Sequence, residues 1–142
     1  MSAPNGFDTA RAFIGDGRPP GIGEALNFRL LEVERGFAVC GGELGRHAMN
    51  ATGFVHGGYI ATLLDTACGF AVLSLLSADQ TYTTIDLKTA YHRGLRPEVG
   101  TVRAEGRVVT IGRRVAFAEA KLLGGDGKLY ASATSSLLVI AS

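Results

Sequence analysis

An almost unbroken apolar stretch over residues 57–78 limits the folds open to this chain more than any other feature of its sequence. The stretch is rich in Ala and Leu and is too long for one strand, so it predicts a single long helix over residues 57–76. Because apolar residues fall on nearly every face of that helix, it needs cover on all sides. One flat sheet covers a single face. We therefore expect a sheet that curls around the helix, or a second subunit that closes the remaining side.

The apolar stretch approaches the length of a membrane span, but Asp65 lies within it. A carboxylate near the centre of a membrane-spanning helix costs about 2.5 to 3.5 kcal/mol on insertion scales. No basic loop flanks the stretch to set the orientation of such a helix in a membrane. A helix buried inside a globular protein accounts for the same apolarity. We therefore expect no membrane partner.

The two cysteines favour a reducing compartment. Cys40 and Cys68 both lie among apolar residues, and two thiols do not make the disulfide framework of a small secreted domain. An apolar setting raises the pKa of a thiol and makes it unreactive, so we assign Cys68 to the core. The start of the chain also lacks the basic segment and apolar run of a secretory signal. These features predict a cytoplasmic protein.

Length and charge restrict the class of protein further. The chain has 142 residues, of which 46% are hydrophobic, so we expect one domain over residues 1–142. Residues 1–24 form an N-terminal extension with turn signals at 15–17 and 19–21 and at most a short helix around residues 9–14. Lys and Arg total 14 against 13 Asp and Glu, and the net charge of +1 provides no broad basic surface for nucleic acid.

Shorter segments with the composition of β-strands surround the predicted helix. Residues 27–34 and 36–42 fit a hairpin that turns at Glu34-Arg35-Gly36. Four strand patterns follow the helix, at residues 83–92, 102–108, 115–123 and 129–140. A loop at residues 93–100, a reversal at 111–113 and a hairpin turn at 124–127 separate them. This order predicts an α+β domain in which an antiparallel sheet of about six strands, the last four in a meander, wraps around one helix.

Residues 83–92 alternate in polarity with the two-residue period of a strand that buries one face. Thr83 and Thr84 therefore point to opposite faces, and the register of the strand decides which of them faces the helix. Threonine is also common in strands for packing reasons alone.

Two glycines and one carboxylate on the predicted helix are the residues most suited to chemistry. Gly57 and Gly58 place unpaired backbone N–H groups at the positive end of the helix dipole, where they can face a developing oxyanion, although glycines also begin helices merely to make a turn. Asp65, in apolar surroundings, is either a functional carboxylate or a hydrogen-bonded core residue. Eight residues separate Gly57 from Asp65, about 12 Å along a helix. If both act on one carbonyl, they come from two chains of a symmetric dimer.

The segments Asn50, Val55-His56-Gly57-Gly58, Leu64-Asp65 and Thr84-Ile85-Asp86-Leu87-Lys88 resemble the PaaI-type branch of hotdog acyl-CoA thioesterases. The match runs from about residue 23 to residue 138 and follows the order of elements predicted above. The resemblance implies a hotdog fold and hydrolysis of an aryl or a short- to medium-chain acyl-CoA. It also implies a homodimer with composite active sites, and dimers of the family often pair into tetramers.

The resemblance implies a role for each matching residue. Asp65 resembles the nucleophile or general base, and Gly57 resembles the backbone donor that polarises the thioester carbonyl. Asn50 resembles the side chain that holds that carbonyl or the attacking water. His56 lies either near the leaving sulfur or at a cap of the helix. Thr84 resembles a hydroxyl that positions the carboxylate or water, with Thr83 as the alternative.

Coenzyme A carries phosphates, and the cations suited to bind them lie at predicted turns, namely Arg93, Arg96, Arg113 and Arg114. Gly58 and Thr83 are further candidates for contact with the substrate. Charged turns are often merely solvated. The three histidines have no metal-ligand spacing with the cysteines, and no phosphate-binding loop occurs, so we expect neither a metal nor a cofactor beyond the coenzyme A of the substrate.

Two other functions stay open at this point. A hotdog protein can bind an acyl-CoA without hydrolysing it, although Asp65 within its motif argues against such a module, and the short N-terminal segment holds no DNA-reading extension. The other function is that of a hotdog dehydratase. Those enzymes rely on an Asp and His pair at a spacing that differs from the one here, where the first histidine after Asp65 is His92.

Overall fold

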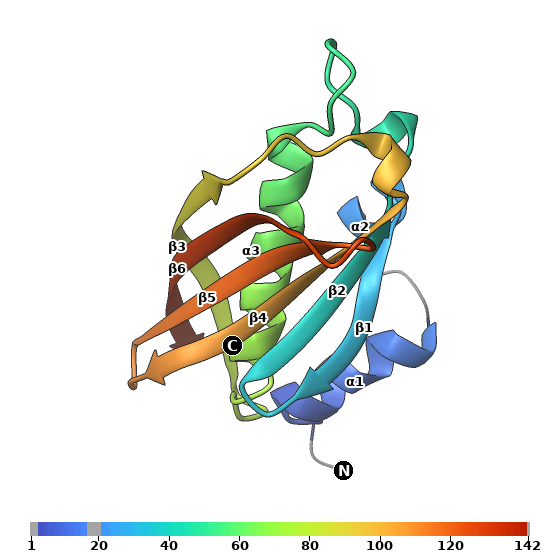
Figure 1. The fold of residues 1–142 in the computed structure, drawn as a ribbon. Helices are drawn as coiled ribbons and strands as arrows, with labels where there is room; N and C mark the ends of the chain where they lie inside the picture. Colours follow the sequence, from blue (N-terminus) through green and yellow to red (C-terminus); the bar gives the residue numbers. More distant parts are fainter. Residues whose placement is uncertain (1–2, 17–20, 142) are drawn as a thin grey trace.

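The computed structural model describes residues 3–16 and 21–141. Its helices and 3₁₀ turns are α1 (Gly6–Asp16), α2 (Ile22–Ala25), η1 (Arg46–Ala48), α3 (Gly57–Leu73) and η2 (Pro97–Val99). Its strands are β1 (Phe28–Glu34), β2 (Phe37–Glu43), β3 (Gln80–Tyr91), β4 (Thr101–Ile111), β5 (Val115–Gly124) and β6 (Leu129–Ala141). Within the described residues the strands form one antiparallel sheet in the order β1-β2-β4-β5-β6-β3, which curves around α3 (Figure 1). The predicted α+β hotdog fold is confirmed.

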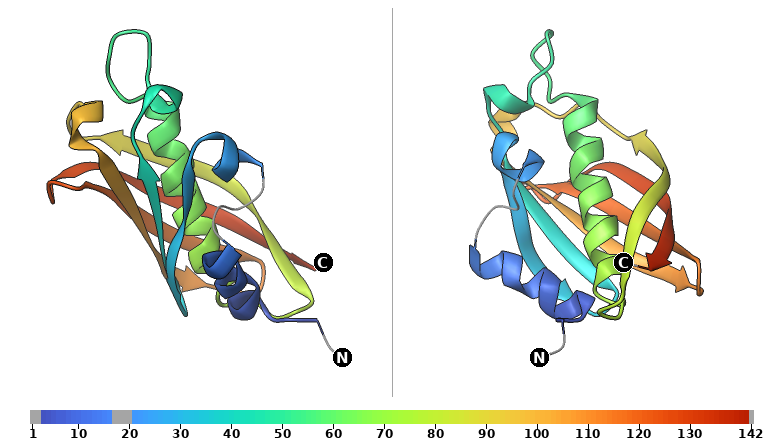
Figure 2. Two further views of the ribbon diagram at one scale, coloured as in Figure 1. Left: turned by 90° about the vertical axis from the view of Figure 1, so that its right-hand side faces the viewer. Right: turned by 180° about the vertical axis from the view of Figure 1, so that it is seen from behind.

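The sheet buries most of α3 and leaves one stripe of it open. α3 contacts all six strands, and its side chains Leu63, Leu64 and Val72 are fully buried. By contrast Gly58, Ala61, Thr62, Asp65 and Thr66 are partly or wholly exposed, and they recur every three or four residues, as positions on one helix face do. Seen from behind, α3 has no strand in front of it (Figure 2, right). Within the described residues, therefore, the sheet covers most of the helix and α1 packs its Phe13 ring against the Phe70 ring at 5.8 Å, while the stripe through Asp65 stays open.

β4 makes the closest approach to α3. A Cβ atom at Gly106 would lie 2.5 Å from the backbone carbonyl carbon and oxygen of Ala67, so any residue larger than glycine collides with the helix backbone. Cys68 follows Ala67 and is fully buried, as predicted, and Cys40 on β2 is fully buried as well. Neither forms a disulfide.

The prediction of a four-strand meander was wrong for β3. Only β4, β5 and β6 follow one another as neighbours, whereas β3 pairs with β6 at the far edge of the sheet. Residues 92–100 cross from that edge past the N-terminal end of α3 to reach β4 (Figure 1). The Val55 N–H donates to the Leu95 carbonyl oxygen at 2.8 Å, and Leu95 is buried. Pairing with β6 makes β3 the edge strand of the sheet, and this edge strand contacts α3.

The strand β3 also departs from regular alternation. It begins at Gln80, three residues before the predicted start, and its pairing with β6 shifts between Thr84 and Asp86. The intervening Ile85 is a bulge and is 56% exposed, although the alternation placed it on one face with Leu87. The bulge lets Thr84 and Leu87 share the half-buried face and turns Thr83 outward.

The observed bounds of helices α1 and α3 differ from the predicted ones. α1 runs from Gly6 to Asp16, longer than the short helix predicted around residues 9–14, because the Asn5 side chain accepts the Asp8 N–H at 2.9 Å and caps it. Residues 15 and 16 continue α1 and do not form a turn, while the turn signals at 17–20 lie outside the described residues. α3 ends at Leu73, three residues early. Its last turn tightens there, with the Leu76 N–H bonded to the Leu73 carbonyl.

No described helix is both long and apolar enough to cross a bilayer.

Candidate active site

Asp65 lies on the open stripe of α3, half-buried beside the edge strand β3. The Thr84 hydroxyl donates a hydrogen bond of 3.0 Å to Asp65 Oδ1. No other described residue hydrogen-bonds this carboxylate, so Oδ2 has no protein partner there. The register thus decides between the two candidate threonines: Thr84 contacts Asp65, and Thr83 is exposed on the other face.

The start of α3 is built by His56, Gly57 and Gly58. His56 is the N-cap residue, and its Nδ1 accepts the Gly58 N–H at 2.8 Å. His56 therefore caps the helix, and the amide of Gly58, one of the predicted binding residues, is already occupied. No described residue accepts a hydrogen bond from the Gly57 N–H. Gly57 thus keeps an unbound donor at the positive end of the helix dipole.

Asn50 organises the loop that precedes α3. Its Oδ1 accepts the N–H groups of Thr52 at 2.9 Å and Phe54 at 3.0 Å, and its own N–H donates to the Phe54 carbonyl oxygen. A bridge between Met49 and Val55 closes this loop, which projects beyond the end of the helix (Figure 1). The side chain of Asn50 was predicted to hold substrate, but its Oδ1 is thus engaged within the loop. Its side-chain nitrogen, Nδ2, has no partner among the described residues.

The four arginines do not form one cluster. Arg93 lies against the Tyr130 ring at 5.8 Å and Arg96 against the Phe54 ring at 4.4 Å, both near the start of α3. Arg113 and Arg114 lie at the opposite end of the sheet, where Val115 pairs with Leu138 and Leu138 pairs with Thr83. One chain therefore does not bring Arg93 together with the Arg113-Arg114 turn.

Two tyrosines of β3 belong to this region and were not predicted. The Tyr91 hydroxyl donates to the Gly57 carbonyl oxygen at 2.7 Å. Tyr82 places its hydroxyl where a Cβ atom of Gly69 would lie, one turn beyond Asp65. Burial and the nearby charge of Asp65 raise the pKa of Tyr82 to about 12. A strand pattern cannot reveal these contacts, because it does not show which helix face the strand crosses.

The buried thiols contribute no nucleophile. Burial raises the pKa of Cys68 to about 12, and the charges of Asp65 and Glu119 act in the same direction. A neutral thiol is a weak nucleophile, in line with the sequence assignment of Cys68 to the core. The described residues hold no group of three His, Cys, Asp or Glu side chains with the geometry of a metal site.

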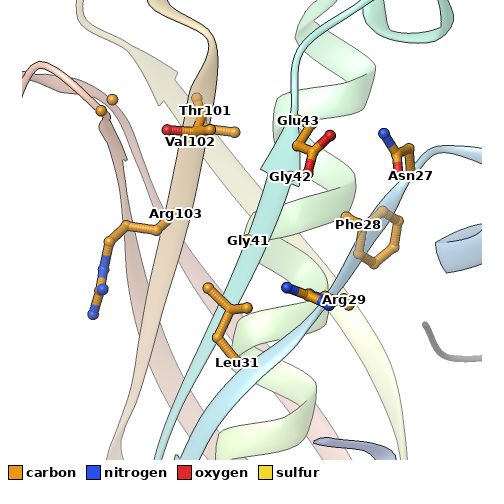
Figure 3. Close-up of a pocket in the computed structure, with 12 residues that line it drawn as sticks. Asn27, Phe28, Arg29, Leu31, Gly41, Gly42, Glu43, Thr101, Val102 and Arg103 are labelled. Atoms are coloured by element: carbon orange, nitrogen blue, oxygen red, sulfur yellow. The ribbon is translucent and has the colours of Figure 1, made fainter. Parts of the chain in front are cut away.

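A separate groove of about 300 Å³ lies on the outer face of the sheet, away from α3 (Figure 3). Gly41 and Gly42 form its floor, and Arg29, Leu31 and Thr101 belong to its walls. None of the predicted site residues lines it. The groove is therefore distinct from the region around Asp65.

Comparisons with known proteins agree with this arrangement. The family model described as Thioesterase superfamily matches residues 52–131, more than half of the chain. A candidate esterase of Halobacterium salinarum is 46% identical over 69 residues, which cover 47% of this chain and 44% of that protein, so the chain matches less than half the length of this curated relative.

Two solved structures are similar over most of their length. A thioesterase family protein from Silicibacter pomeroyi has a TM-score of 0.84 at 23% identity and covers 97% of this chain and 100% of its own, which shows the fold. A variant of the phenylacetic acid degradation protein PaaI from Thermus thermophilus has a TM-score of 0.74 at 27% identity and covers 82% of this chain and 96% of its own. The family match, the helix-borne Asp65 and the curled sheet lead to one conclusion: the chain belongs to the thioesterase superfamily.

Proposed function

We propose that the protein hydrolyses an acyl-CoA to a free acid and coenzyme A, at sites shared between the two chains of a homodimer. The observation that carries this proposal is the Asp65 carboxylate, which Thr84 orients on the stripe of α3 that the sheet leaves open. Membership of the thioesterase superfamily supports thioester hydrolysis as the reaction. Asp65 is the reactive carboxylate of this proposal.

Asp65 can act in two ways at the thioester carbonyl. As a general base it takes a proton from water while the water oxygen bonds to the carbonyl carbon. As a nucleophile its free Oδ2 bonds to that carbon, and water later cleaves the resulting anhydride. In both routes the carbon–sulfur bond breaks, the thiolate of coenzyme A leaves and takes up a proton, and the acyl group leaves as an acid.

Negative charge collects on the carbonyl oxygen in either route, and the unbound Gly57 N–H is the donor suited to receive it. A well-placed donor of this kind contributes about 3 kcal/mol to stabilisation of the transition state. The N-terminal end of α3 adds the favourable end of its dipole. The side-chain nitrogen of Asn50, Nδ2, is a second donor close to this helix end.

The distance between these groups supports a dimer. Gly57 and Asp65 lie on the same helix, about 12 Å apart along its axis, which is too far for both to act on one carbonyl from the same chain. The open stripe of α3 and the unpaired outer edge of β3 give a second chain a surface on which to dock. In a symmetric dimer, Gly57 of one chain then faces Asp65 of the other. Pairing of such dimers into a tetramer remains part of the proposal.

The remaining features of the substrate follow from the resemblance. Arg93, Arg113 and Arg114 are the proposed contacts for the phosphates of coenzyme A. Arg93 lies at one end of the sheet and Arg113 and Arg114 at the other, so in the dimer one chain contributes Arg93 to a site and its partner contributes the other two. An aryl or a short- to medium-chain acyl group fits the proposal, with no cofactor besides the coenzyme A of the substrate. Two unpaired buried thiols support a cytoplasmic location.

The test is release of free thiol from a panel of aryl- and alkyl-CoA thioesters by the wild type and by Asp65→Asn. We expect the substitution to reduce kcat by orders of magnitude while acyl-CoA binding persists. Asp86→Asn is the matched control, because Asp86 is exposed on β3 and its Oδ1 accepts the Ser136 N–H, an interaction that asparagine preserves. If the wild type binds several acyl-CoAs tightly but hydrolyses none, the protein is a binding module and not an enzyme.

A further inference from the structure

The last residue of β3 is tied to the first residue of α3. The Tyr91 hydroxyl donates a 2.7 Å hydrogen bond to the Gly57 carbonyl oxygen. A Cβ atom at position 57 would lie 3.1 Å from that hydroxyl and 3.2 to 3.4 Å from ring carbons, so glycine allows this close contact without displacement. The bond spans 34 residues of sequence and connects the edge strand to the helix end.

This bond completes the fixation of one peptide group. The peptide that joins Gly57 to Gly58 has its carbonyl held by Tyr91 and its N–H held by His56 Nδ1 at 2.8 Å. Two successive glycines would otherwise be the most mobile pair at a helix end, since neither carries a Cβ atom that restricts its backbone angles. The Gly57 N–H belongs to the preceding peptide, whose His56 carbonyl oxygen accepts the N–H groups of Tyr59 at 3.0 Å and Ile60 at 3.2 Å. With the peptides on both sides of Gly57 held, the backbone angles between them are restricted, and so is the direction of the unbound N–H.

The Tyr91 side chain is 51% exposed, so its ring contributes little to the core. Its strongest contact with the helix is the hydroxyl group. Tyr91→Phe removes that hydroxyl and keeps the ring, which makes the contribution of the hydrogen bond measurable without a new cavity.

We propose that Tyr91 is a positioning residue of the thioesterase site, which holds the Gly57 N–H in the direction of the thioester oxygen. This inference rests on the proposed function. Tyr91 itself needs no contact with the substrate, because it acts through the Gly57–Gly58 peptide. It therefore affects the stabilisation of the oxyanion and not the binding of the acyl group or of coenzyme A.

Tyr91→Phe is expected to lower kcat about 3- to 10-fold, the effect of one hydrogen bond, and to leave KM unchanged. The factor should be the same for aryl and alkyl substrates, because the carbonyl is common to all of them. Tyr130→Phe is the matched control: it removes a hydroxyl that bonds Asp126 in the β5–β6 turn, and it should keep wild-type kcat. Thermal unfolding of both variants measures any general loss of stability.

Backbone order parameters of Gly57 and Gly58 from NMR relaxation provide a readout that does not depend on activity. We expect values of about 0.85 in the wild type and a fall toward about 0.6 in Tyr91→Phe. Unchanged order parameters, or wild-type kcat in Tyr91→Phe alongside a strong effect of Asp65→Asn, overturn the inference and leave the proposed function intact. An equal loss of kcat in Tyr130→Phe also overturns it. If the wild type hydrolyses no acyl-CoA, the proposed function fails, and the order parameters still decide whether Tyr91 fixes the peptide.

Discussion

Thr84 Oγ1 on β3 donates a 3.0 Å hydrogen bond to Asp65 Oδ1 on α3, and this is the one direct link between the edge strand and the carboxylate among the described residues. Thr84→Val keeps the shape of the side chain and removes the donor. Because a single hydrogen bond to a charged group is lost, we expect kcat for acyl-CoA hydrolysis to fall about 10-fold. Steady-state thiol release measures it.

Thr83→Val is the control for the register of β3. Thr83 is exposed on the opposite face, and the bulge at Ile85 keeps it there. Its replacement should leave kcat at the wild-type value. A larger effect from Thr83→Val than from Thr84→Val would show that β3 pairs in another register in solution.

Most of the fold could be predicted from periodicity. The length and apolarity of the stretch that became α3 allow no strand, and regular alternation placed β4 within a few residues of its observed bounds. The spacing of Gly57 and Asp65 also follows from the sequence alone, because helix rise is constant. These features are local and need no knowledge of the partner strands.

The remaining features depend on contacts between distant segments. Alternation cannot show that β3 pairs with β6, nor that one extra residue at Ile85 changes which threonine faces Asp65. Such choices are made by tertiary packing. The capping role of His56 is local by contrast, because its Nδ1 accepts the N–H of Gly58 only two residues away, and the sequence motif does not show whether the side chain turns back toward that N–H.

The close approach of β4 to α3 predicts a strong difference between two glycines. Gly106→Ala places a Cβ atom 2.5 Å from the backbone of Ala67, which cannot move without shifting the helix. Gly41→Ala meets only the Leu31 side chain, a flexible group on the outer face. We expect Gly106→Ala to lower the free energy of unfolding by about 3 kcal/mol and Gly41→Ala by about 1 kcal/mol or less, measured by urea denaturation. Equal effects would mean that the helix and sheet are less tightly packed than described.

The buried thiols predict loss of stability in alkali. Burial raises the pKa of Cys40 and of Cys68 from 9.0 to about 12. Above about pH 9 the unfolded chain loses these protons while the folded chain keeps them, so the free energy of unfolding should fall as the pH rises from 9 toward 12. Urea midpoints across this range measure the slope. The double variant Cys40→Ala/Cys68→Ala is less stable overall but should show a shallower slope, and an unchanged slope would assign the effect to other groups, such as Tyr82.

A mixture of two inactive variants tests whether the active site is shared between chains. Gly57→Pro removes the proposed oxyanion donor, and proline is well accepted at the first position of a helix. The extended backbone of His56, with φ −64° and ψ 133°, also suits a residue before proline. The new ring must displace the Tyr91 side chain slightly. Asp65→Asn removes the carboxylate, and we expect each variant alone to be nearly inactive.

Equal co-expression of the two variants should restore about a quarter of the wild-type activity per chain, because a composite site receives an intact Gly57 from one chain and an intact Asp65 from the other in one pairing out of four. This fraction holds for dimers and for tetramers built from them. If both groups act within one chain, every site in the mixture lacks one of them, and no activity returns. Circular dichroism of Gly57→Pro separates that outcome from simple misfolding, since a folded but inactive chain is required for the comparison.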